Sequence, residues 1–349
     1  MKSVESDFAG ESESVSQHWR SVVLFGLNVA SYKFALAKSL LELGQAGREK
    51  VTLEELAVPF TRHVCEHIGR VDRQGTFEHS RFLDACRFRN AGRIGDDELW
   101  TAAATLGFNN VIDAFHTVSS TEIPTRFFID ERRTATRGIR LTDELLALAA
   151  TGCMAADLTG EAESRWRLVE EAWAARAAGH QVTVLYDAPR ELLVPALLGK
   201  RRPITEARPA LNGYQKGHCF FCFRPITLVA GPDGGNADVD HFFPFVLNAR
   251  GFPIDLDQVW NLELACVDCN RGRGSKAAIL PHERYLERLH RRNEYLIWSK
   301  HPLRETLIAQ TGITTIVRRD FLREVMRSCQ HDLGARGGWT ARTEHKPLF

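Results

Sequence analysis

The chain has 349 residues, enough for roughly two or three domains with a substantial buried core. Its hydrophobic fraction of 44% and its charged fraction of 26% are typical of a globular protein. The formal net charge is only +1, which excludes a protein that coats nucleic acid through its overall charge, so any attraction to phosphate must be local.

Residues 1–16 are polar and acidic, and we expect them to form a disordered tail. They lack the basic and apolar segments of a signal peptide. The apolar stretch 21–43 is interrupted by Lys33, Lys38 and Glu42, so it falls short of a membrane span. We therefore expect a cytoplasmic protein with no membrane partner.

Residues 17–200 are predicted to form a mainly helical domain. Apolar side chains on nearly every face predict a buried helix over residues 19–44. Thr52 and Glu55 have the spacing of a capping box, which predicts a helix that continues to about His67. Four more helices are predicted at 80–88, 96–106, 142–150 and 164–178, capped by Ser80, Asp96, Thr142 and Ser164, and two strands at 126–130 and 182–186.

Two patterns in this domain have both a functional and a structural interpretation. The arginines of the first could face phosphate, but a solvated charged surface explains them more simply: Arg126, Arg132, Arg133, Arg137 and Arg140. The second is His63 and His67, whose spacing of four is compatible with a metal site. A pair of this kind is more often structural.

Residues 201–281 contain two cysteine pairs of the CxxC type. Cys219 and Cys222 form the first pair and Cys266 and Cys269 the second, with 43 residues between the pairs. Four thiolates in two such pairs are typical of a closed tetrahedral structural zinc site. Redox activity or disulfides are the alternative, which the absence of a secretory signal and of a thioredoxin-like motif disfavours. We expect a structural Zn²⁺.

The segment between and after the pairs contains Asp238-Val-Asp240-His241-Phe-Phe-Pro244, then Asn261, then Cys269-Asn270-Arg-Gly-Arg-Gly-Ser-Lys276. Over about 75 residues this order resembles the HNH endonucleases, especially the zinc-containing type of bacterial restriction nucleases. It is also similar to the HNH domain of RNA-guided CRISPR effectors. The resemblance implies a ββα-metal fold, in which a strand carries Asp240 and His241, a second strand follows, and a helix carries Asn270.

The resemblance also implies a role for each of these residues. His241 would be the general base, because imidazole titrates near neutral pH. Asp240 and Asn270 would hold one catalytic ion, and their oxygen donors favour Mg²⁺ or Mn²⁺. Asn261 would brace the loop and orient the base, although a turn residue before a strand explains it too. Asp238 is either a supporting carboxylate or an exposed strand residue.

The region from Arg271 to Arg304 has nine Lys and Arg residues against three Glu. Arg271, Arg273 and Lys276 directly follow Asn270, where we expect a helix to begin, and are predicted to contact phosphate. Further arginines recur at helical spacing and fit either phosphate contacts or a solvated helix face: Arg284, Arg288, Arg291 and Arg292. Residues 282–349 are predicted to form a helical C-terminal extension, with helices at 283–298, 302–310 and 318–330.

The sequence thus predicts a mainly α protein with a small α+β insert. Our first hypothesis is a metal-dependent endonuclease that cuts double-stranded DNA, and the resemblance implies a role in restriction or anti-phage defence. The helical domain would then hold the nuclease inactive or bind a regulatory protein partner. Two alternatives remain: a zinc-ribbon module that binds nucleic acid without cutting it, and a nuclease that cleaves RNA or nicks one strand.

Overall fold

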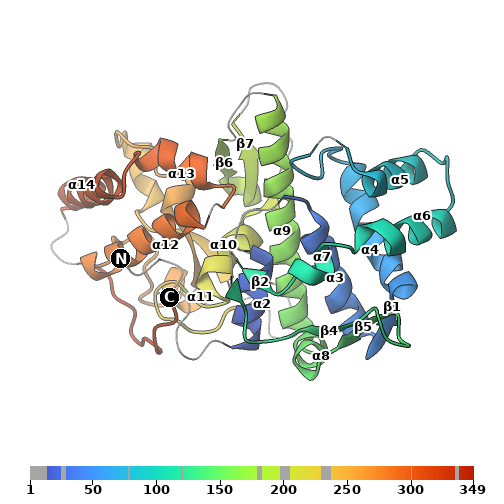
Figure 1. Cartoon of the computed structure of the whole chain (residues 1–349). Helices are drawn as coiled ribbons and strands as arrows, with labels where there is room; N and C mark the ends of the chain where they lie inside the picture. Colours follow the sequence, from blue (N-terminus) through green and yellow to red (C-terminus); the bar gives the residue numbers. More distant parts are fainter. Residues whose placement is uncertain are drawn as a thin grey trace. The chain divides into compact units, whose positions relative to one another are not determined.

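The structure is a computed structural model, and it describes residues 14–24, 29–77, 79–118, 121–178, 183–196, 205–228, 237–299, 301–334 and 338–349. The chain divides into two compact units, Glu11–His180 and Gln181–Phe349. Each is mainly helical with small antiparallel sheets, as the sequence predicts (Figure 1). Within the described ranges, no helix has the length and apolar character needed to cross a membrane.

The N-terminal unit, Glu11–His180, packs its helices around one apolar core that includes Trp19, Phe34, Phe60 and Trp166. Its described helices are α2 (Val15–Leu24), α3 (Tyr32–Gln45), α4 (Leu53–Ile68), α5 (Arg81–Asn90), α6 (Asp96–Ala102), the π-helical turn η1 (Ala103–Gly107), α7 (Val111–Ala114), α8 (Asp143–Ala150) and α9 (Gly152–Ala177).

The described part of this unit also contains five short strands: β1 (Lys50–Thr52), β2 (Thr117–Val118), β3 (Thr121–Glu122), β4 (Phe128–Glu131) and β5 (Gly138–Leu141). Strand β5 lies between β1 and β4 in an antiparallel sheet. Gly138 is required there, because a Cβ atom at this position would lie 1.9 Å from the Val51 carbonyl oxygen.

Several predicted helices of this unit are confirmed and two are corrected. The capping box of Thr52 and Glu55 is present, and the Ser80 hydroxyl accepts a hydrogen bond from the Leu83 amide. The single helix predicted over 19–44 is wrong, since Val29 and Ser31 form backbone hydrogen bonds with residues 74–76. Ser164 is no cap either; it is buried within the 26-residue helix α9.

The other two predicted caps also differ in detail. Gly95 is the cap of α6, and Asp96 is its first helical residue. Thr142 stands at the cap position of α8 but makes no side-chain cap hydrogen bond; its hydroxyl donates to the Arg126 carbonyl oxygen at 2.7 Å. Of the predicted acidic tail, residues 1–13 lie outside the described ranges, and Val15 and Ser16 belong to α2.

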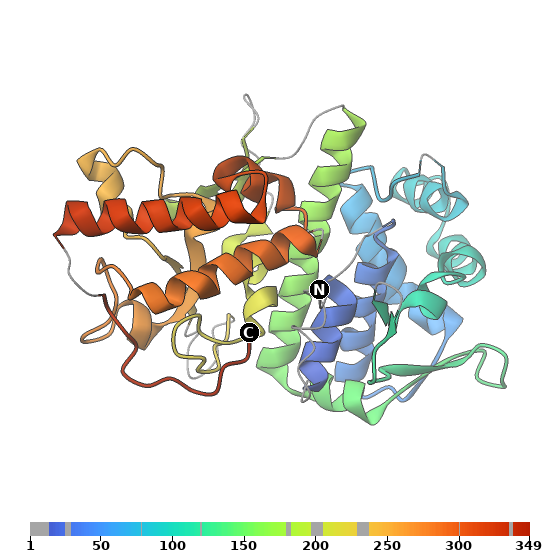
Figure 2. The same ribbon diagram turned by 60° about the vertical axis from the view of Figure 1, so that its left-hand side comes forward.

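The C-terminal unit, Gln181–Phe349, contains the motif-bearing region. Its described elements are β6 (Val184–Asp187), η2 (Ala188–Arg190), β7 (Leu192–Pro195), β8 (Thr205–Glu206), α10 (Ala207–Gln215), β9 (Ala237–His241), η3 (Phe245–Arg250), η4 (Val259–Asn261), β10 (Leu262–Cys266), α11 (Val267–Asn270), η5 (Glu283–Tyr285), α12 (Leu286–Trp298), α13 (Arg304–Thr311) and α14 (Thr315–Leu333). Helices α12 and α14 lie side by side (Figure 2).

Strands β9 and β10 form an antiparallel pair in which Asp240 lies opposite Glu263 and His241 opposite Leu262. Helix α11 follows β10 directly, so the order strand, loop, strand, helix is the one that the sequence predicts. The Gln215 side chain at the end of α10 both donates to the Leu264 carbonyl and accepts from the Leu264 amide, each at 2.8 Å. This amide pairing satisfies the free edge of β10.

Candidate functional site

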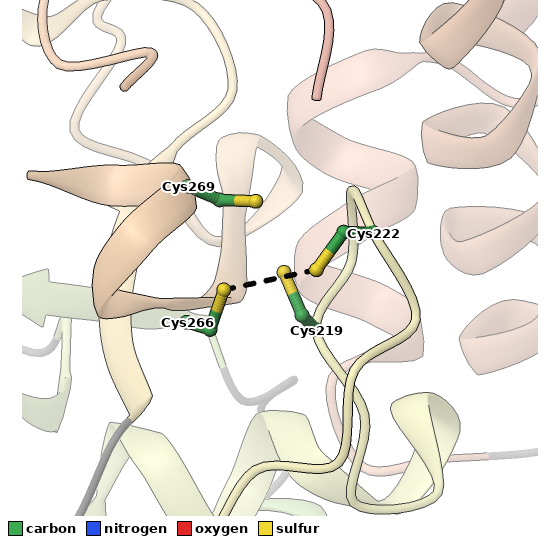
Figure 3. A group of neighbouring side chains, drawn as sticks. All are labelled: Cys219, Cys222, Cys266 and Cys269. Carbon is green, nitrogen blue, oxygen red and sulfur yellow. Dashed lines mark hydrogen bonds between the residues drawn. The ribbon is translucent and has the colours of Figure 1, made fainter. Parts of the chain in front are cut away.

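The four cysteines of the two CxxC pairs come together in the C-terminal unit (Figure 3). All four are buried, and their sulfur atoms lie within 4.8 Å of one another. The Sγ atoms of Cys222 and Cys266 are 3.7 Å apart. Four sulfurs around one Zn²⁺ would be about 3.8 Å apart, given Zn–S bonds of about 2.3 Å in tetrahedral geometry. The cluster could therefore hold a metal ion such as zinc.

The thiols are free rather than joined in disulfides, as are the chain's other cysteines. Hydrogen bonding from Cys219 lowers the pKa of Cys222 to about 7 and lowers the pKa of Cys266 further. Hydrogen bonding with Cys219, Cys222 and Cys266 raises the pKa of Cys269, and burial raises it further. Within the described part of the chain, this is the one group of three or more His, Cys, Asp or Glu side chains close enough to bind a metal.

Strand β9 carries the predicted Asp240 and His241 on opposite faces, as the alternation of a strand requires. Asp240 faces inward and is 7% exposed. Its Oδ1 accepts a hydrogen bond from the Lys276 Nζ at 3.1 Å, whereas its buried Oδ2 has no hydrogen-bond partner in the described structure. One carboxylate oxygen of Asp240 is thus buried without a hydrogen-bond partner among the described residues.

A second carboxyl group, that of Glu263, lies opposite Asp240 on β10 and is completely buried. Neither of its oxygens has a hydrogen-bond partner among the described residues. Burial raises the pKa of Glu263 well above the usual range, and the nearby Asp240 raises it further, so both effects favour the neutral carboxyl. Glu263 is not among the residues predicted from the sequence, although a lone charged residue in the apolar run of β10 is a visible signal.

His241 faces the opposite side of β9, and its side chain is 16% exposed. Its Nε2 lies 2.8 Å from the Oδ1 of Asp257, a residue of the loop between β9 and β10. The Phe245 ring stacks on the imidazole at 5.1 Å between centroids, and the Tyr186 ring of β6 lies at 5.9 Å. The sequence gives no sign of this contact, because a loop separates Asp257 from His241.

Asn261 is completely buried and braces the loop with its side-chain amide. Its Oδ1 accepts from the Phe243 amide at 2.8 Å, and its Nδ2 donates to the carbonyls of Phe243 and Leu256 at 3.0 and 2.8 Å. Three hydrogen bonds from one buried amide favour the loop-bracing interpretation of Asn261 over that of an ordinary turn residue.

Asn270 is the last residue of α11, and its side chain reaches back to β9. The Asn270 Nδ2 donates to the Oδ2 of Asp238 at 3.1 Å, and Arg271 pairs with the same carboxylate at 2.9 Å. Asp238 is therefore not an exposed strand residue but a link between β9 and α11. Arg271 and Arg273 are exposed. They follow the C-terminal end of the four-residue helix α11, so the prediction that they lie at a helix N-terminus is wrong.

Lys276 does not fit its predicted contact with phosphate, because its side chain is 0% exposed. Its ammonium group instead donates to Asp240 and, at 2.7 Å, to the His241 carbonyl. Two of the predicted basic-face arginines are likewise structural. Arg288 donates to the Phe220 and Phe221 carbonyls of the first cysteine pair, and buried Arg292 donates to the Val259, Trp260 and Leu262 carbonyls.

The two ambiguous patterns of the N-terminal unit make polar contacts within that unit. His67 lies between the carboxylates of Glu163 and Glu170, and His63 faces Glu42. Arg132 pairs with Asp130 and Asp113, Arg140 with Glu131, and Arg126 with Glu122. These contacts support the structural interpretation of both patterns.

No protein-family model, no curated protein and no solved structure matches this chain.

Proposed function

We propose that the C-terminal unit is a metal-dependent endonuclease of the HNH type that hydrolyses DNA phosphodiester bonds. The observation that carries the proposal is the placement of His241 and Asp240. A partly exposed imidazole and a buried carboxylate with one free oxygen stand at neighbouring positions of one strand. A base and a carboxylate that could bind a cation are two groups that phosphodiester hydrolysis requires, and here they occupy adjacent positions at the end of β9.

The proposed reaction begins with a water molecule beside the imidazole. With Nε2 bonded to the Asp257 carboxylate, Nδ1 is the ring atom that remains to accept a proton. His241 removes a proton from the water as its oxygen attacks phosphorus, the opposite P–O bond breaks, and the leaving oxygen takes a proton from solvent. Asn261 keeps the loop that follows His241 in place.

The ion that we propose for this site is one Mg²⁺ or Mn²⁺, because both prefer oxygen ligands. Asp240 would hold it through the carboxylate oxygen that has no partner in the described structure, and Asn270 would hold it through its amide oxygen. The bound ion would supply positive charge to the phosphate and the leaving oxygen. Arg271 and Arg273, exposed beside Asn270, would contact the phosphate backbone without reading its sequence.

One observation favours the alternative, a module that binds nucleic acid without cutting it. The buried ammonium of Lys276 already neutralises Asp240, as a metal ion would. If this pairing persists on DNA, the carboxylate has little electrostatic need for a second cation.

A plasmid-cleavage assay with Mg²⁺, Mn²⁺ or EDTA tests the proposal. Wild type should nick or linearise the plasmid, and His241→Ala should lower the rate by at least about 100-fold. His331→Ala is the matched control, because this histidine of the same unit has an 89% exposed side chain. A folded, zinc-loaded wild type that cuts neither DNA nor RNA, with or without cell lysate to supply a partner protein, would support the binding module instead.

A further inference from the structure

The imidazole of His241 is held on three sides by side chains of the C-terminal unit. Phe245 stacks on one face with an interplanar angle of 29°, and Tyr186 lies against it at 60°. The Asp257 carboxylate, 2.8 Å from Nε2, is the one side chain that forms a hydrogen bond with the ring among the described residues. The aromatic rings restrict the plane of the imidazole, and only Asp257 distinguishes one ring nitrogen from the other.

Asp257 is fixed by a network within the loop between β9 and β10. The Asp255 Oδ1 accepts from the Asn248 Nδ2 and from the Asp257 amide, both at 2.9 Å. The Asn248 Oδ1 accepts from the Leu256 amide at 3.0 Å, and the Leu256 carbonyl accepts from Asn261. The backbone on which Asp257 stands is thus cross-linked to both ends of the loop, and the carboxylate is preorganised toward His241.

We infer that Asp257 is the positioning residue of the general base: it fixes the His241 tautomer that carries its proton on Nε2. This inference deepens the proposed function and rests on it. An ionised carboxylate only accepts hydrogen bonds, so it requires a proton on Nε2 and leaves the lone pair on Nδ1.

The same contact acts during the proposed reaction. When Nδ1 takes the proton of the attacking water, the ring becomes an imidazolium, and the Asp257 carboxylate stabilises the new positive charge without taking a proton itself. No other described acidic side chain is placed to do so: Asp240 faces the opposite side of β9 and is paired with Lys276. Asp257 therefore acts through His241 and touches neither metal nor phosphate in this scheme.

Two measurements on the full-length, zinc-loaded protein test the inference. The first is the ¹⁵N NMR signature of the His241 ring in its neutral form, which reports the tautomer. Wild type should show the Nε2–H form, and Asp257→Ala should show a mixture of both tautomers. Asp257→Asn keeps the size and one acceptor oxygen, so it should lie between them. Asp320→Asn, an exposed carboxylate of α14, is the control that should match wild type.

The second measurement is the cleavage rate. Asp257→Ala should lower kcat by about 10- to 100-fold with KM changed less than about 3-fold, because the residue orients the base and does not bind DNA. Asp257→Asn should recover part of the loss. An unchanged kcat, or a loss confined to KM, would overturn the role in catalysis.

The NMR result separates this inference from the proposed function. If Asp257→Ala and Asp257→Asn leave the tautomer unchanged, the inference is wrong whatever the cleavage rate. If the tautomer changes as expected but wild type cuts no nucleic acid, the nuclease proposal fails and Asp257 still sets the state of His241. Zinc content measured in each variant shows that the unit is folded.

Discussion

His67 lies in the core of the N-terminal unit between two carboxylates. Its Nδ1 is 2.8 Å from Glu170, its Nε2 is 3.1 Å from Glu163, and its ring stacks on Trp166 with 3.5 Å between centroids. Burial lowers the pKa of His67, but the two carboxylates outweigh burial and raise it above the ordinary value. Both ring nitrogens can donate only in the imidazolium form, so the contact stabilises a charged histidine in the core.

The stability of this unit should therefore depend on the protonation of His67. Because its pKa is raised on folding, the stabilisation is complete below about pH 6.5, the pKa of the unfolded chain, and is lost as the pH rises through the folded pKa. Urea unfolding at pH 6 and pH 9 should show that wild type loses more stability over this range than His67→Gln does. Burial lowers the pKa of Lys33 to about 8, so its contribution to stability changes with pH in the opposite direction. Lys33 is present in both proteins, and its contribution cancels when their pH dependences are subtracted. Equal pH dependence in both would contradict the prediction.

Arg292 and Arg291 are adjacent residues of α12 with opposite surroundings. Arg292 is buried and donates to three backbone carbonyls around β10, whereas the Arg291 side chain is 68% exposed. Arg292→Met should lower the free energy of unfolding of the C-terminal unit by roughly 2 to 5 kcal/mol, because it leaves buried acceptors without donors. Arg291→Met should change it by less than about 0.5 kcal/mol. Similar values in chemical denaturation for both variants would refute the assignment of Arg292 to structure.

At the scale of elements, the two cysteine pairs join segments that are far apart in sequence. The second pair belongs to the junction of β10 and α11, and Arg288 of α12 holds the first pair through its carbonyls. A metal ion at the four thiols would therefore connect β10, α11 and the segment that contains Cys219 and Cys222. Strand β9, which bears His241, pairs with β10, so losing the ion would also weaken the position of β9.

We expect about one zinc ion per protein chain, and Cys269→Ser should bring the zinc content close to zero. The C-terminal unit should then be destabilised by more than about 3 kcal/mol, since the binding energy of a structural zinc contributes to folding. Cys153→Ser, at an exposed cysteine of the N-terminal unit, is the control and should keep both zinc and stability. Elemental analysis together with urea denaturation measures both quantities. Full stability of a zinc-free Cys269→Ser protein would contradict this role.

The sequence predicted local features better than contacts between distant residues. The Thr52 capping box follows from the spacing of neighbouring residues, and the cysteine cluster follows from two CxxC pairs, each of which is a local pattern. The order β9, β10, α11 is the one that the family resemblance implies. The start of α9, the burial of Lys276 and the contact between Asp257 and His241 depend on which segments pack together. A lysine in a basic run looks like a phosphate ligand until a buried carboxylate is found beside it.

At the scale of the whole molecule, the chain divides earlier than the composition suggests. The sequence placed a boundary at residue 200, which lies outside the described ranges, whereas the two compact units divide between His180 and Gln181. The reason is the sheet of β6, β7 and β8, which crosses residue 200 in sequence. Strands β6 and β7 lie before residue 200 and pair with each other, and β7 also pairs with β8, which lies after it. Tyr186 of β6 also packs on His241, so the residues before 200 complete the candidate site.

Each unit has its own buried core, and the cysteine cluster belongs to the second alone. A fragment of residues 11–180 should therefore fold by itself, and its urea midpoint should not respond to a zinc chelator. A fragment of residues 181–349 should fold with zinc, and its cooperative urea unfolding transition should disappear when the chelator removes the zinc. A fragment that starts at residue 201 should be less stable than this one, because it lacks β6 and β7. Circular dichroism of the three fragments measures these transitions, and a chelator-sensitive 11–180 fragment would contradict the division.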